Sequence, residues 1–294
     1  MLLSDLDRIT KAQGVFIASL EKKYGREAVR LQRRLLEAIQ EDLLSRLDVT
    51  DGKIVNSPKN YRIIYEFDQV WSDYSDTYFS PTIQRFATDA LKVTNFSKDY
   101  FKAFGGSISL STKALTQATE NIWLMMGLEQ AGKQMKFITG GYLDRLLLAS
   151  EVRNQVMEYL TDSVTVSTDF KDMLSTLREM IQGKETDGTL QRYFRSYVYD
   201  TFSGVQRAYD NYVAEQAGLN YFVYAGTVIE STREFCEDNL NQVFHRDILD
   251  EWETQDWKGK NKDLPVKIAL GGYNCRHRLN WIPDELVSDF ELKT

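Results

Sequence analysis

Proline, cysteine and histidine are scarce in this chain. Its 294 residues include four prolines, two cysteines and two histidines. Because proline breaks a helix from within, the long interval between Pro81 and Pro265 leaves room for many uninterrupted helices. Two cysteines exclude a disulfide framework and allow one bridge at most. Apolar runs are short as well. None approaches the ~18–20 residues of a membrane-spanning helix, so we expect no membrane association.

Basic residues are the minority among the charged side chains. The formal net charge is −7 at pH 7, and the pI is about 5.1. The segment from 218 to 294 has nine Lys and Arg against fourteen Asp and Glu, so it contributes −5 of that charge. Because contacts to phosphate require clustered Lys and Arg, this balance argues against a general nucleic-acid-binding surface.

The first residues show no secretory signal. The stretch "MLLSDLDRIT" lacks the basic residues followed by an apolar run that such a signal needs. We therefore expect the protein to be made in a cytosol and to stay there. Hydrophobic residues make up 43% and charged residues 27% of the chain, proportions that are typical of globular proteins and not of disordered ones.

Most of the chain before residue 218 is predicted to be helical. Between residues 27 and 48, apolar side chains recur every three or four positions, which is typical of an amphipathic helix. Ser57-Pro58 and Ser80-Pro81 match the N-cap and first-turn arrangement, so helices are expected to begin near both prolines. A longer helix is predicted over residues 189–217. The apolar face of the first helix comprises Leu35, Leu36, Ile39, Leu43, Leu44 and Leu47.

The composition changes near residue 218. The stretch "NYFVYAGTVIESTR" is rich in β-branched and aromatic residues and predicts one or two strands joined near Gly226. We therefore expect a helical body over residues 1–217 and a second unit over 218–294. The predicted fold class is mainly α, with a small α+β module at the C-terminal end. Trp252, Trp257 and Trp281 are expected to form the core of that module, with a partner-binding anchor as the alternative.

The rare reactive side chains gather in this module. All four fall between residues 236 and 277: Cys236, His245, Cys275 and His277. In an extended segment Cys275 and His277 project from the same face, because they are two residues apart. One interpretation is a structural zinc site with these four ligands. The alternatives are two buried cysteines with locally hydrogen-bonded histidines, and a disulfide between the two cysteines.

An active site is the other interpretation of the same side chains. A Cys–His pair can form a thiolate nucleophile whose imidazole Asn274 or Asp247 would orient. The spacing, however, matches no peptidase signature, and an HNH-type nuclease would require a basic groove in a region that is acidic. The sequence therefore predicts no catalytic or cofactor-binding residue and leaves zinc as the candidate ion.

The order of elements in this module resembles a known family. A Thr-Arg-x-x-Cys element follows the predicted strand, a Val-Phe pair comes next, and a glycine-led Asn-Cys-Arg-His element closes the segment. This order is similar to the C-terminal domain of the phage Mu F-like family, the minor head or head-morphogenesis proteins of tailed bacteriophages. The resemblance covers about a quarter of the chain, residues 218–285. Its positions are Thr232, Arg233, Cys236, Val243, Phe244, Gly271, Gly272, Asn274, Cys275, Arg276 and His277.

The resemblance implies a structural protein of the virion and not an enzyme. Such a protein is present in few copies, oligomeric, and located inside the head near the portal vertex after assembly in the host bacterial cytoplasm. It contributes to capsid assembly, DNA packaging or DNA delivery. Its expected partners are the portal protein and other head proteins, and packaged DNA lies within reach although the sequence has no strong DNA-binding signature.

Two other functions stay open at this point. One is a metal-assisted hydrolase, a nuclease or a peptidase, in which His245, His277 and one cysteine would act on a helical delivery scaffold. The other is a cytosolic helical adaptor with a zinc module.

Overall fold

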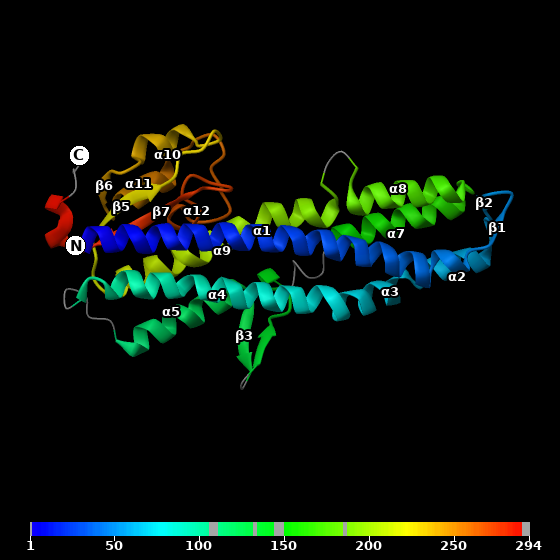
Figure 1. Ribbon diagram of the computed structural model, residues 1–294, viewed down its shortest axis with the longest axis horizontal. Helices are drawn as coiled ribbons and strands as arrows, with labels where there is room; N and C mark the ends of the chain where they lie inside the picture. The colour runs from blue at the N-terminus through cyan, green and yellow to red at the C-terminus, as the bar shows by residue number, and fades with distance from the viewer. Residues whose placement is uncertain (1, 106–110, 132–133, 144–149, 185–186, 290–294) are drawn as a thin grey trace. The chain divides into compact units, whose positions relative to one another are not determined.

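The computed structural model describes residues 2–105, 111–131, 134–143, 150–184 and 187–289. Long helices dominate, and one three-stranded sheet lies in the last quarter of the chain (Figure 1). This confirms the predicted class, mainly α with a small α+β region. Within the part of the chain that the structure describes, no helix is both long and apolar enough to cross a membrane.

The contacts divide the chain into two compact units. The sheet unit comprises residues 1–20, 88–125 and 196–294, and the hairpin unit comprises residues 21–87 and 126–195. Three long helices contribute residues to both units: α1 (Leu2–Asp42), α4 (Ser80–Lys102) and α9 (Thr189–Gln216).

The predicted boundary near residue 218 lies where α9 gives way to strand β5 (Tyr221–Gly226). The compact unit that holds this strand also contains segments from the first 217 residues, because helices from that part of the chain cover the sheet. Tyr100 on α4, for example, donates a hydrogen bond from its hydroxyl to the carbonyl of Trp281 at 3.0 Å.

The hairpin unit contains several shorter helices and two small hairpins. The predicted apolar face is present on α1, where Leu35, Leu36 and Ile39 are buried. The other three predicted positions, Leu43, Leu44 and Leu47, are also buried but lie after the end of this helix. Regular helix ends at Asp42, and a 3-10 turn, η1, follows. The remaining elements are η1 (Leu44–Arg46), β1 (Val49–Thr50), β2 (Lys53–Ile54), α2 (Pro58–Tyr65), α3 (Phe67–Tyr74), η2 (Ser75–Phe79), β3 (Leu128–Ala131), β4 (Gln134–Phe137), α7 (Ser150–Thr165) and α8 (Phe170–Gln182).

The two serine–proline pairs behave differently. Ser57 caps α2, because its hydroxyl accepts a hydrogen bond from the Asn60 amide at 3.3 Å and Pro58 occupies the first turn. Helix α4 also begins near its proline, Pro81, but the chain does not break there. The π-helix η2 joins α3 to α4. A wider turn suits a proline, which has no amide hydrogen and whose ring would crowd the carbonyl four residues earlier.

The sheet unit is built around strand β5. β5 pairs antiparallel with β6 (Val243–His245) on one side and with β7 (His277–Ile282) on the other. The remaining elements are α5 (Thr112–Met125), α10 (Glu234–Asn239), α11 (Ile248–Thr254), α12 (Val266–Ala269) and η4 (Asp284–Asp289). The sequence predicted one or two strands joined near Gly226, and the structure has one, which ends at that glycine.

Aromatic side chains form the core of the sheet unit. Trp252 and Trp281 are buried, as predicted, and both pack edge-on against Phe222 of β5. Trp257 is half-buried and stacks on Phe235 with the ring centroids 3.9 Å apart. Its indole nitrogen donates to the carbonyl of Gly271 at 3.0 Å, which ties the polar loop after α11 to the glycine pair. The tryptophans therefore act mainly as core residues here.

A buried carboxyl lies among the helices of the same unit. Asp210 on α9 is 8% exposed, and its Oδ2 accepts a hydrogen bond from Gln206 at 2.9 Å. Burial raises the pKa of Asp210 to about 7, against the opposing effects of hydrogen bonds from Ser97 and Gln206 and of the Arg278 charge. Near neutral pH the protonated and ionised forms of Asp210 are therefore about equally populated in the folded protein.

This carboxyl predicts a pH dependence of stability. Because the pKa is higher in the folded than in the unfolded state, the stabilisation is complete below about pH 4 and is lost as the pH rises through about 7. Between these limits the free energy of unfolding should fall by up to about 1.4 kcal/mol per pH unit from this group. Asp210→Asn should remove that slope. Denaturant titrations at several pH values measure the difference between the two proteins, and identical slopes would contradict the assignment.

Candidate metal centre

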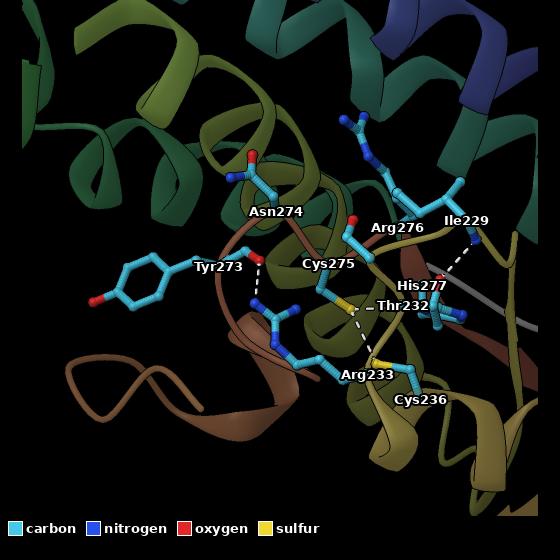
Figure 2. A pocket seen from close by; sticks show the side chains of 10 residues that line it. Ile229, Thr232, Arg233, Cys236, Tyr273, Asn274, Cys275, Arg276 and His277 are labelled. Carbon is cyan, nitrogen blue, oxygen red and sulfur yellow. Dashed lines mark hydrogen bonds between the residues drawn. The ribbon is translucent and has the colours of Figure 1, made fainter. Parts of the chain in front are cut away.

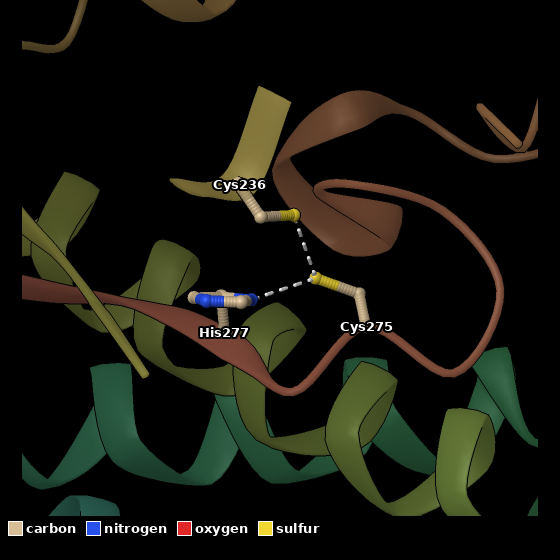
Figure 3. A group of neighbouring side chains, drawn as sticks. All are labelled: Cys236, Cys275 and His277. Carbon is tan, nitrogen blue, oxygen red and sulfur yellow. Dashed lines mark hydrogen bonds between the residues drawn. The ribbon is translucent and has the colours of Figure 1, made fainter. Parts of the chain in front are cut away.

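Three of the four rare side chains meet in the sheet unit. Cys236 lies on α10, Cys275 lies in the loop before β7, and His277 is the first residue of β7. All three are buried, with exposed fractions of 1%, 2% and 3%. Figure 3 shows the two sulfur atoms and the imidazole pointing toward one another. Their ligand atoms all lie within 4.8 Å of one another, so this group could hold a metal ion.

Two of the three distances between the ligand atoms fit a tetrahedral zinc site. With Zn–S bonds of about 2.3 Å and a Zn–N bond of about 2.0–2.1 Å, the two sulfurs should be about 3.8 Å apart, and a sulfur and a nitrogen about 3.6 Å apart. The Cys236 and Cys275 sulfurs are 3.8 Å apart. The Cys275 sulfur lies 3.6 Å from Nδ1 of His277. Both cysteines are free thiols in the structure. The structure therefore does not contain the disulfide that was one of the alternative interpretations.

The glycine pair makes this approach sterically feasible. A Cβ atom on Gly271 would overlap with the Cys236 sulfur and would lie 3.3 Å from the Cys275 sulfur. Gly272 has a φ of 113°, a conformation that residues with a side chain rarely adopt. The loop that carries Cys275 can therefore pass directly against α10 only because two glycines precede it.

Strand β5 supplies the wall beside the cluster. The hydroxyl of Tyr224 donates to the Cys236 sulfur at 3.2 Å. The ring of Tyr224 also stacks on the His277 imidazole, with the centroids 5.3 Å apart. Nε2 of His277 is buried and has no hydrogen-bond partner among the described residues. The imidazole is thus held by stacking and by its neighbour Cys275.

Arg207 on α9 fixes the backbone of two of these residues. Its guanidinium donates to the carbonyl of Cys275 at 2.6 Å and to the carbonyl of His277 at 2.7 and 3.0 Å. A further hydrogen bond reaches the carbonyl of Ile268 at 2.8 Å. Arg207 is only 3% exposed. One buried side chain therefore holds α12 and the start of β7 in place.

The pKa values of the two thiols are shifted in opposite directions. The hydrogen bond from Cys236 is the main cause that lowers the pKa of Cys275 well below its ordinary value, and His277 and Arg207 lower it further. The same hydrogen bond, together with burial, raises the pKa of Cys236. Zinc binds both sulfurs as thiolates, so its binding would release the protons that the two thiols carry.

A half-buried carboxyl lies close to this cluster. Asp200 on α9 accepts a hydrogen bond at Oδ1 from the Asn274 amide at 2.7 Å. Burial raises the pKa of Asp200, while that hydrogen bond and the charge of Arg207 lower it. The contact fixes the position of Asn274, whose φ of 55° belongs to the left-handed region that asparagine tolerates.

His245, the fourth predicted ligand, is not part of the group. In the sheet register Tyr221 lies opposite His245, whereas Gly226 lies opposite His277. The two histidines therefore lie at opposite ends of β5, five residues or roughly 17 Å apart along the strand. The side chain of His245 is 45% exposed and its Nδ1 lies 3.1 Å from Asp247 Oδ2. The interpretation as a four-ligand site is corrected to three ligands among the described residues.

Four other residues of the resemblance, Thr232, Arg233, Asn274 and Arg276, line the same cavity as the cluster (Figure 2). Thr232 accepts a hydrogen bond from the Ile229 amide at 2.7 Å, and Arg233 donates to the Tyr273 carbonyl at 2.7 Å. Arg276 lies over the ring of Tyr199, 3.6 Å from its centroid.

Comparisons with known proteins add no relative. No family model matches the chain, and no curated protein or solved structure matches it either. The case for a function is therefore carried by the residues and their geometry.

Proposed function

We propose that this chain is a structural minor head protein of a tailed bacteriophage. In this role it associates with the portal protein and other head proteins, and contributes to capsid assembly, DNA packaging or DNA delivery. It is assembled in the bacterial cytoplasm and located in the virion, inside the head near the portal vertex. The sheet unit is the part that carries the resemblance to the phage Mu F-like family.

The observation that carries this proposal is the convergence of the two motif elements. Thr232, Arg233 and Cys236 are separated from the glycine-led element by more than thirty residues. In the fold they line one cavity together with Asn274, Cys275, Arg276 and His277. The sequence pattern shared with the family thus corresponds to one physical site, as expected if the pattern specifies a module and not two unrelated turns.

We further propose that the ion of this site is zinc. Two thiols and an imidazole are ligands that zinc prefers. The sulfur–sulfur distance and the distance from the Cys275 sulfur to Nδ1 of His277 match a tetrahedral zinc complex. An ion held by α10, the Cys275 loop and β7 would cross-link three elements that are short and separate in sequence. A zinc ion in this place stabilises the module in the proposed function.

The hydrolase alternative has less support. It requires His245 and His277 to act together, yet they lie at opposite ends of β5. A cytosolic helical adaptor with a zinc module remains compatible with the helices and with the Cys236, Cys275 and His277 cluster. It does not account for Thr232, Arg233, Asn274 and Arg276, which line the same cavity.

Localisation tests the proposed function. Particles of the phage that encodes this chain should contain it, and mass spectrometry of purified, nuclease-treated particles should detect it together with the portal protein. The large terminase subunit, which leaves the head after packaging, serves as the control for contamination by unassembled proteins. Particles that contain the portal protein but lack this chain would contradict the proposal.

A further inference from the structure

The three metal ligands line an open cavity. The cavity has a volume of about 250 Å³, and Cys236, Cys275 and His277 form part of its wall (Figure 2). Structural zinc sites usually have four protein ligands, whereas sites with three protein ligands keep one position for an external molecule. The described residues supply three ligands within reach of one ion. An external ligand that enters this cavity would be next to the metal and could occupy its fourth coordination position.

The protein closes the other sides of the cluster. The backbone of Gly271 lies so close to both sulfurs that a Cβ would not fit. The ring of Tyr224 covers the imidazole of His277, and its hydroxyl is bonded to the Cys236 sulfur. The carbonyls on either side of Arg276 are held by Arg207. The side that lacks such a cover is the cavity.

The charges at this cavity favour an anion. A divalent zinc ion with two thiolates and a neutral imidazole has no net charge. The residues that line the cavity include Arg233 and Arg276 but no Asp or Glu. Arg233 is oriented across it by its hydrogen bond to the Tyr273 carbonyl. Because one face of a guanidinium can bind a carboxylate or another anion in a forked arrangement, Arg233 is placed to stabilise a negatively charged ligand.

We propose that the metal centre has an open fourth coordination position that binds a monodentate anionic ligand from the cavity, with Arg233 as the residue that attracts it. This inference rests on the metal site of the proposed function and adds the class of ligand that completes it. The chemistry of the site defines this ligand as an anion with one negatively charged donor atom that is small enough to enter a cavity of about 250 Å³.

The test uses the full-length protein loaded with cobalt(II), whose absorption spectrum reports the coordination of the metal, and azide as the anionic probe. Addition of azide should change the cobalt bands in a saturable manner. Arg233→Met should weaken the apparent azide affinity about tenfold, which is the effect of losing one charge-assisted hydrogen bond. Arg233→Lys, which keeps the charge, should weaken it less. Arg246→Met removes an arginine near His245, at the other end of β5, and should leave the affinity within about twofold.

The outcomes separate this inference from the metal site itself. One equivalent of cobalt with a spectrum that azide does not change would mean that the protein supplies the fourth ligand, and would overturn the inference while the metal site stands. Equal azide affinity in Arg233→Met and the unaltered protein would overturn the role of Arg233. Failure to bind cobalt at all would contradict both the metal site and the inference. Thermal melts of each variant show whether it is folded.

Discussion

Cys275→Ala should abolish stoichiometric zinc binding and destabilise the sheet unit. Cys275 is the central member of the cluster, since its sulfur lies 3.8 Å from Cys236 and 3.6 Å from His277. A ligand that binds only the folded state stabilises it by about 4 kcal/mol when its free concentration is about 1,000 times the dissociation constant. Loss of that contribution should lower the midpoint of thermal unfolding by roughly 10 °C.

Elemental analysis and a thermal melt measure these two effects on protein purified without added metal. His245→Ala is the matched control, because it removes an imidazole that lies at the far end of β5. It should keep one equivalent of zinc and change the midpoint little. If the unaltered protein has no zinc and a chelator leaves its melt unchanged, the thiols are buried apolar groups instead of ligands.

Arg207→Met should cost about 4 kcal/mol of the free energy of unfolding. The substitution keeps a long apolar side chain but removes every hydrogen bond to the carbonyls of Cys275, His277 and Ile268. Each bond to a charged donor contributes about 1.5–3 kcal/mol, and the carbonyls would be left buried without a partner. Arg207→Lys should recover only part of the loss, because one ammonium group cannot replace the guanidinium fork.

Arg207 also positions the metal ligands, so its replacement should have a second effect. Residues that orient metal ligands typically change metal affinity about 10- to 100-fold when replaced. Competition with a chromogenic zinc chelator measures this affinity, and urea titration measures stability. Arg33→Met is the control. Its side chain is 63% exposed and makes one ion pair, to Glu37 at 3.6 Å. If Arg207→Met and Arg33→Met lost zinc affinity and stability to the same extent, the assigned role of Arg207 would be contradicted.

Helices and their buried faces could be predicted where they depend on residues that are close together in the sequence. Leu35, Leu36 and Ile39 are buried because a period of three to four residues places them on one face of α1, whatever that face packs against. The cap formed by Ser57 and Pro58 is local in the same sense. The course of the chain at Pro81 was not predictable, because it depends on the π-helix that leads into α4.

The candidate site likewise has some features that the sequence determined and others that it could not reveal. The sequence alone determined that the reactive side chains are concentrated in the last quarter of the chain, that Cys275 and His277 share a face, and that glycines precede them. It could not reveal Arg207 or Tyr224 as neighbours of the cluster, since neither is near the cysteines in sequence.

Only the tertiary structure decided which residues form the group. Both β6 and β7 pair antiparallel with β5, and the register puts His245 opposite Tyr221 but His277 opposite Gly226. A spacing along the chain does not encode that register, because it depends on the turns and helices between the strands. The amino-acid sequence therefore supplied the ligand types and the module, and the pairing of strands selected three of the four ligands.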